Sequence, residues 1–317
     1  MPTVIPTLVV PTATAVVAIT APVTLPPPSA TALPPIGTAT QPPTPLPSPS
    51  ATLGVLPSAT ATPRRVRATA TVSPAPRRGS AVQVGTPSPR AAAPLVVLDP
   101  GHGGKETGAI GPDGLVEKDL NLVIARGAAA RLRAAGIGVL LTRDADVEVN
   151  RPPVDVNGDG GIDVDDDLQA RVDLANAAGA WLLVSIHNNA DPRNPGERGT
   201  TTYYCADGTA AQESRRLADT LHTHLLAAIR GAGYTTGDRR VRDDAELGKP
   251  GGHLYLLGPH NTRIARPSLM PGALGETLFL SNQADAAQLA HPAMLDTLAT
   301  GYAEGIRAYL DGLPPLP

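Results

Sequence analysis

Apolar runs and amphipathic segments alternate along the chain after residue 94. Short apolar runs, several of them rich in Val, Ile and Leu, predict buried strands over residues 95–100, 137–143, 180–187, 201–205, 253–258 and 272–280. Apolar residues three and four apart predict helices over residues 117–136, 168–178, 212–230 and 284–310. Strands that alternate with helices indicate the α/β class. We therefore expect a single domain over residues 95–312, with a mixed, largely parallel central sheet flanked by helices. The polar residues 231–252 predict no element.

The first 94 residues have a different composition. They contain 21 of the 35 prolines and no aromatic or acidic residue. A segment that proline breaks so often, and that has no aromatic side chains, cannot bury enough apolar surface to offset its conformational entropy. We therefore expect residues 1–94 to be a disordered, Pro/Thr/Ser/Ala-rich stalk or linker.

Charge and hydropathy exclude several classes of partner. The net charge is −3, but residues 1–98 carry six arginines and no acid, whereas the rest of the chain has 20 basic and 29 acidic residues. An acidic folded part argues against nucleic acid, because phosphate binding needs a basic face. No segment is a clear membrane span. The most apolar early run, residues 8–25, also lacks the positive leading region of a signal peptide.

The single cysteine and most histidines have no obvious partners in the sequence. Cys205 cannot form an internal disulfide, and it lacks the closely spaced Cys and His residues of a zinc finger. His222 and His224 lie two residues apart in a predicted helix and do not share a face, so we expect both on the surface. Structural roles are expected for the histidines His253, His260 and His291.

Candidate chemistry lies where predicted strands end. His102 follows the strand over residues 95–100 in a glycine-rich loop, His187 ends the strand over residues 180–187, and Glu117 opens the first helix. Two imidazoles and one carboxylate are a suitable ligand set for a catalytic zinc ion, with a fourth position for water.

A second candidate is a carboxylate inside an apolar strand. Glu276 lies within GALGETLFL, and an unpaired buried carboxylate is costly, so it must be paired, neutral or functional. A salt bridge to an arginine stays the alternative to a catalytic base.

Five motifs occur in order along the folded part: DPGHGG (99–104), GLVEKDLNL (114–122), LLTRDAD (140–146), SIHNNA (185–190) and ETLFLSN (276–282). In this order they resemble the motifs of zinc-dependent N-acetylmuramoyl-L-alanine amidases of the amidase-3 type. The resemblance covers about residues 95–310, essentially the whole predicted domain.

The resemblance implies His102, Glu117 and His187 as zinc ligands and Glu276 as the catalytic carboxylate. It implies a bacterial cell-wall hydrolase in which a zinc-activated water cleaves the amide bond between N-acetylmuramic acid and L-alanine. Glu276 would take the proton of the water and give it to the departing nitrogen. The partner would be peptidoglycan, the location extracellular or in the cell envelope, and the protein a monomer.

The chain departs from the family pattern at two places. Asn188 replaces a usually small residue, and Thr277-Leu278 stand where glycine is common. These changes would alter the pocket and leave the metal and the base in place. Asn189 and Asn282 could orient the substrate or the metal ligands, with turn and capping roles as the alternative.

Two other functions remain open at this point. The first is a non-catalytic peptidoglycan-binding module of the same fold, which loss of a ligand would favour. The second is a zinc amide hydrolase that acts on small N-acyl amino acids or peptides. A binding module would not release peptides from peptidoglycan, whereas an amidase would. A hydrolase of the second kind would cleave small N-acyl amino acids in preference to muropeptides.

The insertion DVNGDGGIDVDD (155–166) matches the template of a calcium-binding loop. Gly160 permits the sharp turn, and Ile162 stands where an apolar residue anchors the loop. The last position is Asp in place of the usual Glu, which resembles dockerin-type loops. The alternative is an acidic, solvated insertion. The candidate calcium ligands are Asp155, Asn157, Asp159, Gly161, Asp163 and Asp166.

Overall fold

A six-stranded sheet forms the centre of residues 94–313, the part of the chain that the computed structural model describes. Its strand order is β2-β1-β3-β6-β4-β5. β1, β2, β3 and β6 are mutually parallel, β4 is antiparallel to β6, and β5 is parallel to β4. The predicted mixed, largely parallel sheet is therefore confirmed. The strands are β1 (Leu95–Pro100), β2 (Gly138–Leu141), β3 (Leu182–Asn189), β4 (Thr200–Tyr204), β5 (Asp238–Asp243) and β6 (Gly272–Phe279).

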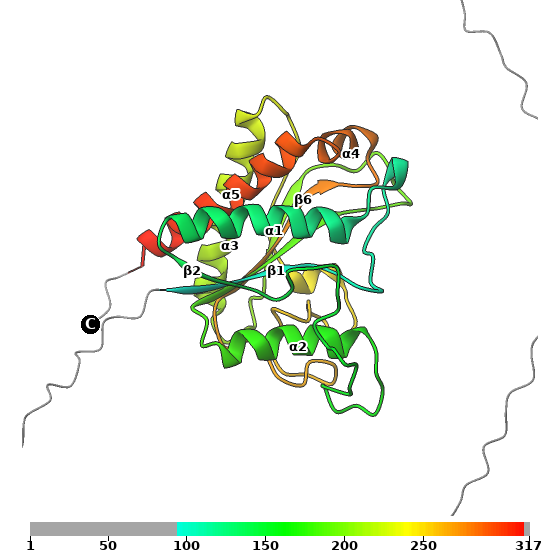
Figure 1. Cartoon of the computed structure of the whole chain (residues 1–317), viewed down its shortest axis with the longest axis vertical. Coiled ribbons are helices and arrows are strands. Elements are labelled where there is room, and N and C mark those ends of the chain that lie inside the picture. The colour runs from blue at the N-terminus through cyan, green and yellow to red at the C-terminus, as the bar shows by residue number, and fades with distance from the viewer. Residues whose placement is uncertain (1–93, 314–317) are drawn as a thin grey trace, which may run out of the picture. The chain divides into compact units, whose positions relative to one another are not determined.

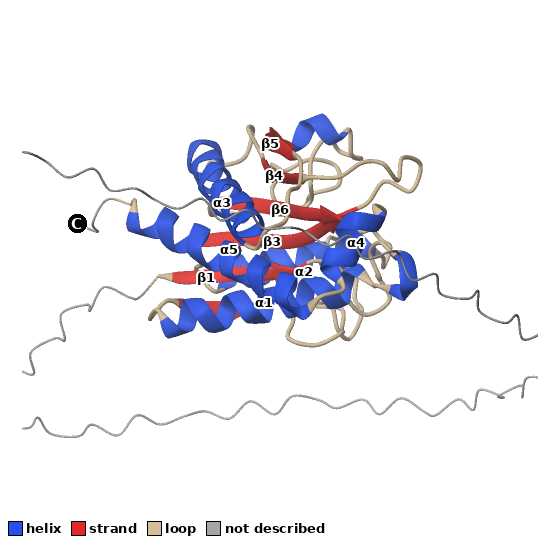
Figure 2. Ribbon diagram, turned by 90° about the horizontal axis from the view of Figure 1, so that it is seen from above, coloured by secondary structure: helices blue, strands red, loops and turns tan. Residues whose placement is uncertain are grey.

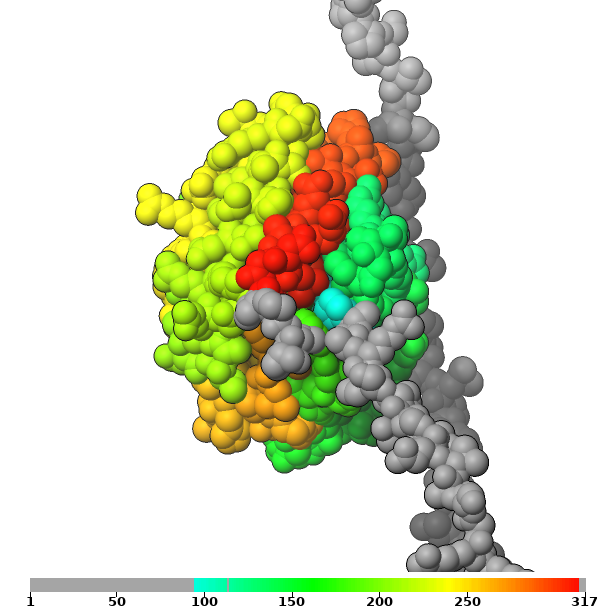
Figure 3. Space-filling view, turned by 90° about the vertical axis from the view of Figure 1, so that its left-hand side faces the viewer, coloured from blue at the N-terminus to red at the C-terminus, as the bar shows by residue number. Residues whose placement is uncertain are grey.

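Helices cover both faces of this sheet (Figures 1 and 2). α1, α3 and α5 lie on one face, where α5 packs between α1 and α3 (Figure 3). α2 lies on the opposite face. The helices are α1 (Glu117–Ala134), α2 (Val164–Ala177), α3 (Ala211–Gly231), α4 (Gln283–Leu289) and α5 (Pro292–Asp311), with short 3-10 turns η1 (Pro112–Gly114) and η2 (Asp244–Leu247).

The alternation of side chains along the strands builds two cores. Val96 and Leu98 of β1 join the core under α1, whereas Val97 joins the core under α2. The same alternation in β3 directs Leu183 toward α2 and Val184 toward α1. By the same alternation, Asp99 of β1 and Ser185 of β3 lie on the α2 side of the sheet, near the carboxyl ends of their strands.

Two predicted helices differ from those in the structure, one in its first residue and the other because it is divided in two. α2 begins four residues earlier than predicted, because Asp163 caps it in a capping box with Asp166. The predicted helix over residues 284–310 is two helices, α4 and α5, because Pro292 begins a new helix at its N-terminal turn.

Two expectations for the segment before β6 are wrong. Residues 253–258 form a loop with turns, although Tyr255, Leu256 and Leu257 are buried. An apolar run indicates burial, but it does not by itself distinguish a strand from a buried loop. β5 lies within residues 231–252, where no element is predicted, because its charged sequence DRRVRD forms a partly exposed edge strand.

The predicted tail over residues 1–94 lies outside the described residues, except for Pro94. Within residues 94–313, no helix combines the length and the apolar character needed to cross a membrane.

Candidate functional site

The predicted metal ligands converge at the carboxyl ends of β1 and β3. The two strands pair in parallel. His102 Nε2 lies 3.2 Å from Glu117 Oε2, and His187 Nδ1 lies 3.0 Å from Glu117 Oε1. One ligand atom from each of the three residues lies within 4.8 Å of the others. The structure thus brings together two imidazoles and one carboxylate, the donor set of many catalytic zinc sites.

The pKa shifts of Glu117 and His187 favour the charge states that a metal ion needs. Burial opposes the charge of Glu117, but hydrogen bonds from His102 and His187 lower the pKa of its carboxyl, so it is an anion at neutral pH. Burial lowers the pKa of His187, and its hydrogen bond to Glu117 offsets only part of this shift. A metal ion needs a neutral imidazole and an ionised carboxylate, and both are present.

Glycines allow the backbone to approach the ligand side chains. A Cβ atom on Gly101 would lie 2.1 Å from the His187 ring. Gly108 has a φ of +66°, and a Cβ there would lie 2.5 Å from both Glu117 Oε2 and the His102 ring. His102 itself has a φ of +62°, a conformation that is uncommon for residues with side chains and that often marks functional sites. The glycine-rich loop therefore makes the room in which the three ligands meet.

A chain of hydrogen bonds among buried polar groups fixes the Glu117 carboxylate. The backbone N–H of Ala109 donates to Oε2 at 2.9 Å, and the Asn121 amide donates to Oε1 at 3.3 Å. Asn188 Nδ2 in turn donates to Asn121 Oδ1 at 3.0 Å, and the Thr277 hydroxyl donates to Asn188 Oδ1. Asn188 and Thr277, which depart from the family pattern, are thus hydrogen-bonded to each other. The Asn188 side chain reaches Glu117 through Asn121, and its backbone N–H donates directly to Glu117 Oε1 at 3.2 Å.

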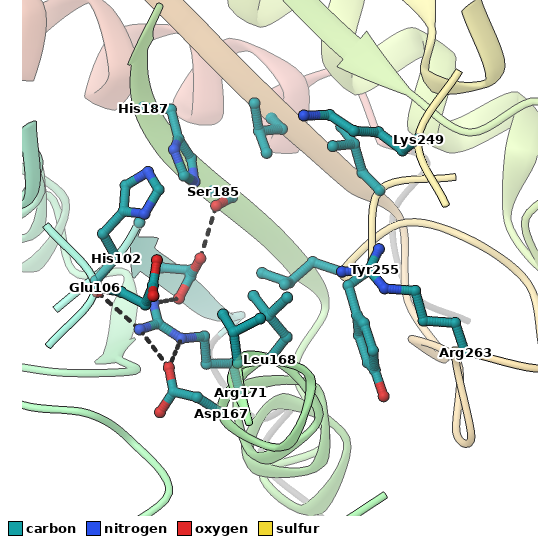
Figure 4. Close-up of a pocket in the computed structure, with 16 residues that line it drawn as sticks. His102, Glu106, Asp167, Leu168, Arg171, Ser185, His187, Lys249, Tyr255 and Arg263 are labelled. Carbon is teal, nitrogen blue, oxygen red and sulfur yellow. Dashed lines mark hydrogen bonds and ion pairs between the residues drawn. The ribbon is translucent and has the colours of Figure 1, made fainter. Parts of the chain in front are cut away.

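Two buried ionic side chains hold the loop that carries His102. Arg171 donates to the carboxylate of Asp99 at 2.8 Å and to the backbone carbonyl of His102 at 2.7 Å (Figure 4). Ser185 and Thr142 each donate to Asp99 at 2.6 Å. Burial alone would raise the pKa of Asp99, but the Arg171 charge and these two hydrogen bonds lower it below its ordinary value.

The role of this pair is not predicted from the sequence. A weak signal is the position of Asp99 at the end of an apolar strand, beside His102. The other partner, Arg171, lies next to the buried residues Val172 and Ala175 on α2.

Glu276 lies beside His187 on the neighbouring strand. The two residues are register partners between β3 and β6, and Thr201 of β4 is opposite Glu276 on the other side. Glu276 Oε2 is buried and has no hydrogen-bond partner among residues 94–313, and none of the ion pairs in this range joins Glu276 to an arginine. Burial and the negative charge of Glu117 raise the pKa of Glu276 well above its ordinary value, while the Lys249 charge opposes the shift. The predicted alternative of an arginine salt bridge is therefore wrong.

A pocket opens beside the two histidines on the α2 side of the sheet (Figure 4). His102 and His187 line one side of this pocket, and Lys249 and Tyr255 line the opposite side. Its other lining residues include Leu168, Leu254 and Leu256. A cavity that combines apolar side chains with polar groups on opposite walls can hold a ligand.

The acidic loop over residues 155–166 has its own pattern of hydrogen bonds. Asp155 accepts from the backbone N–H groups of Gly158 and Gly160. Asp166 accepts from three backbone N–H groups, those of Val156, Asn157 and Asp163. Ile162 is 61% exposed, so the expectation that it anchors the loop is wrong.

Two groups of three His, Cys, Asp or Glu side chains among the described residues lie close enough to hold one metal ion. One is the set of His102, Glu117 and His187, and the other does not include the acidic loop. Calcium binding by this loop stays a prediction.

The structure assigns local roles to three further polar side chains. Asn282 caps α4 by accepting from two backbone N–H groups, which confirms the capping alternative. Asn189 accepts from the backbone N–H of Ala190. His222 is buried and contacts Thr202 and Asp238, so the expectation that it lies on the surface is wrong.

Comparison with known proteins gives one consistent family. A family model described as N-acetylmuramoyl-L-alanine amidase matches residues 96–308. The N-acetylmuramoyl-L-alanine amidase AmiC of Neisseria meningitidis is 31% identical over 240 residues, which are 69% of this chain and 53% of that protein. The germination-specific N-acetylmuramoyl-L-alanine amidase of Bacillus subtilis is 30% identical over 223 residues, which are 70% of this chain and 82% of that protein.

A solved structure agrees with these relatives. The amidase AmiC2 of Nostoc punctiforme is 32% identical, with a TM-score of 0.51, and the match covers 69% of this chain and 97% of that one. The present chain spans about half the length of the Neisseria relative.

Proposed function

The chain belongs to the N-acetylmuramoyl-L-alanine amidase family of the amidase-3 type, and we propose that it is a bacterial cell-wall hydrolase. The bond it cleaves is the amide between N-acetylmuramic acid and the L-alanine of peptidoglycan stem peptides. The observation that carries this proposal is the convergence of His102, Glu117 and His187 at one end of the sheet, with Glu276 on the adjacent strand.

The cofactor we propose is zinc, held by His102, Glu117 and His187. The two imidazoles and the anionic carboxylate suit this ion, and the glycines at positions 101 and 108 leave room beside them. When bound, zinc supplies Lewis acidity at the amide carbonyl and lowers the pKa of a bound water toward about 7. Asn121 and the backbone N–H of Ala109 keep the Glu117 carboxylate oriented toward the histidines.

Glu276 is the proton carrier in this proposal. Its unpartnered buried oxygen is free to accept a proton from the attacking water, and its raised pKa allows it to give that proton to the alanine nitrogen as the bond breaks. A structural carboxylate would have a hydrogen-bond or ion-pair partner in its place.

All four reactive groups are present, which favours an enzyme over a non-catalytic peptidoglycan-binding module. Residues 95–312 form the catalytic domain in this proposal, and residues 1–94 are a stalk that tethers it outside the cell or within the envelope. Peptidoglycan is the partner.

The test is digestion of purified peptidoglycan sacculi by the full chain. We expect soluble stem peptides with a free N-terminal L-alanine, identified by mass spectrometry. Chelation of the metal should abolish their release, and added zinc should restore it, because the attacking water depends on the ion. As a matched control, His102→Ala should stay inactive after zinc addition, whereas the exposed His260→Ala should behave as the unaltered chain does.

Two outcomes contradict the proposal. Sacculi that bind the protein but release no peptide indicate a binding module. Cleavage of small N-acyl amino acids, with intact muropeptides left uncut, indicates a different amide hydrolase of the same family fold.

We also propose that the loop over residues 155–166 binds calcium. Asp155 and Asp159 are exposed and available to an ion, and extracellular calcium loops typically bind with Kd values of about 10⁻⁴ to 10⁻³ M. Saturating calcium should therefore raise the melting temperature, since a ligand at 100 times its Kd stabilises the native state by about 2.7 kcal/mol. The measurement is thermal unfolding with calcium or magnesium. Asp159→Asn is the control, because Asn keeps an acceptor for the Gly161 N–H but loses the charge. Equal melting temperatures with and without calcium would refute the site.

A further inference from the structure

A second cluster of metal-ligating side chains lies outside the proposed active site. It consists of Cys205, Asp244 and His253, with one potential ligand atom from each residue within 4.8 Å of the others. Cys205 Sγ lies 3.4 Å from His253 Nδ1, and Asp244 Oδ1 lies 3.0 Å from the same nitrogen. Cys205 is far from the other two residues in the sequence, so the fold brings it to Asp244 and His253.

Each residue comes from a different segment near β4 and β5, at the β5 edge of the sheet. Cys205 directly follows β4, Asp244 begins η2 after β5, and His253 precedes the buried loop over residues 254–258. Cys205 is 2% exposed and Asp244 is fully buried. A buried thiol and a buried carboxylate thus lie against one imidazole nitrogen, and this nitrogen carries at most one proton for the two of them.

The distances fit ligands of one tetrahedral ion. Ligand atoms about 2.0–2.3 Å from a zinc ion at tetrahedral angles are about 3.4–3.6 Å apart. The sulfur–nitrogen distance of 3.4 Å matches this spacing, and the nitrogen–oxygen distance of 3.0 Å is slightly shorter. Thiolate, imidazole and carboxylate together favour zinc over calcium or magnesium, which prefer oxygen ligands alone.

Surrounding groups contact two of the three ligands. The backbone N–H of Leu254 donates to Asp244 Oδ2 at 2.8 Å, which leaves Oδ1 directed at the cluster. The Asp207 carboxylate lies 3.9 Å from the other ring nitrogen of His253. A carboxylate at the second nitrogen of a ligating histidine is a common partner in zinc sites.

A glycine makes room for this arrangement. A Cβ atom on Gly258 would lie 2.5 Å from the His253 Cβ. Any larger residue at position 258 would push His253 away from Cys205 and Asp244.

We propose that Cys205, Asp244 and His253 bind a second zinc ion, separate from the one at His102, Glu117 and His187. Binding breaks the S–H bond of Cys205 and releases its proton to solvent, and no other reactant is needed. The ion links the ends of β4 and β5 to the segment that carries Lys249, Leu254 and Tyr255. This segment lines the pocket of the proposed active site, so the second ion stabilises one wall of that pocket.

The test measures metal content and does not depend on activity. The full chain is stripped with a chelator, reconstituted with zinc, passed through a desalting column and analysed for metal and protein. We expect about two equivalents of zinc in the unaltered chain and about one in Cys205→Ala, because the latter loses the thiolate ligand. His102→Ala should also hold about one equivalent, because it loses only the first site.

Cobalt reconstitution gives a second readout, and the unaltered chain alone is enough to test the proposal with it. A thiolate bound to Co²⁺ produces an intense near-ultraviolet charge-transfer band. This band should appear in the unaltered chain and in His102→Ala, and it should be absent from Cys205→Ala. His224→Gln, a partly exposed histidine on α3, is the matched control and should keep both the metal content and the band.

The two readouts decide the proposal in either direction. Absence of the charge-transfer band from the cobalt-loaded unaltered chain overturns it, even if Cys205→Ala fails to fold. Equal metal content in folded Cys205→Ala and in the unaltered chain also overturns it. A chain that shows the band but releases no stem peptides contradicts the proposed amidase function and leaves the second metal site intact.

Discussion

Glu276→Gln should lower the release of stem peptides from peptidoglycan by about 10²- to 10⁴-fold, the contribution typical of a positioned acid–base group. Glutamine keeps the shape of the side chain but cannot take the proton of the attacking water at neutral pH. The three proposed zinc ligands are untouched, so the zinc content should not change. Peptide release measured by mass spectrometry and metal content measured on the same sample test both parts.

The comparison needs a glutamate that has no part in the chemistry. Glu304→Gln on α5 serves this purpose, since Glu304 is an exposed residue whose only ion-pair partner among the described residues is His224. It should leave peptide release unchanged. Normal turnover by Glu276→Gln, with the same metal content, would show that another group carries the proton.

Arg171→Met should cause the largest loss of stability among single substitutions at this end of the sheet. Arg171 and Asp99 are both buried, and Arg171 also pairs with Asp167. Methionine fills much of the volume but leaves the Asp99 carboxylate buried without its cation. Breaking one partner of a buried ion pair costs about 3–5 kcal/mol, and this loss should appear in the free energy of unfolding measured with urea. Zinc affinity should fall as well, because Arg171 holds the carbonyl of His102.

The pH dependence of this loss follows from the pKa of Asp99. In the unaltered protein the folded-state pKa lies below its ordinary value of 3.8. The Asp99 contribution to stability is therefore fully present above that value, and it is lost as the pH falls through the lower, folded-state pKa. Without Arg171, burial raises the pKa, so the variant loses stability as the pH rises through the raised value. The difference in unfolding free energy between the two proteins should thus widen from about pH 4 to pH 7.

An exposed ion pair provides the control for this prediction. Arg131→Met breaks the pair with Asp296, whose side chain is 68% exposed. Exposed pairs contribute at most about 1 kcal/mol, so this variant should remain close to the unaltered protein in stability. An equal effect of both substitutions would mean that the buried pair does not hold the strand ends together.

The sequence alone determined the class of the fold, and it predicted the three residues that we propose as ligands of the first metal site. β1 and β3 begin with the apolar runs LVVL and LLV, which are typical of buried parallel strands. The structure pairs these two strands in parallel, so the histidines at their carboxyl ends lie at the same edge of the sheet. Glu117 at the start of the amphipathic helix completed the set, and the ordered motifs pointed to the same residues. At His102, Glu117 and His187 the sequence pattern and the three-dimensional structure therefore agree.

Only the tertiary structure decided which distant polar groups meet. The partner of Asp99 is Arg171, the support of Glu117 reaches through Asn121 and Asn188 to Thr277, and Cys205 lies against His253 and Asp244. Apart from Glu117 and Asn121, which lie four residues apart on α1, no spacing rule relates these residues, because their contacts depend on how helices and loops pack against the sheet. The same reason explains residues 253–258. Their apolar side chains indicated burial, but the packing of a loop between β5 and β6, and not the pattern itself, determined that they form no strand.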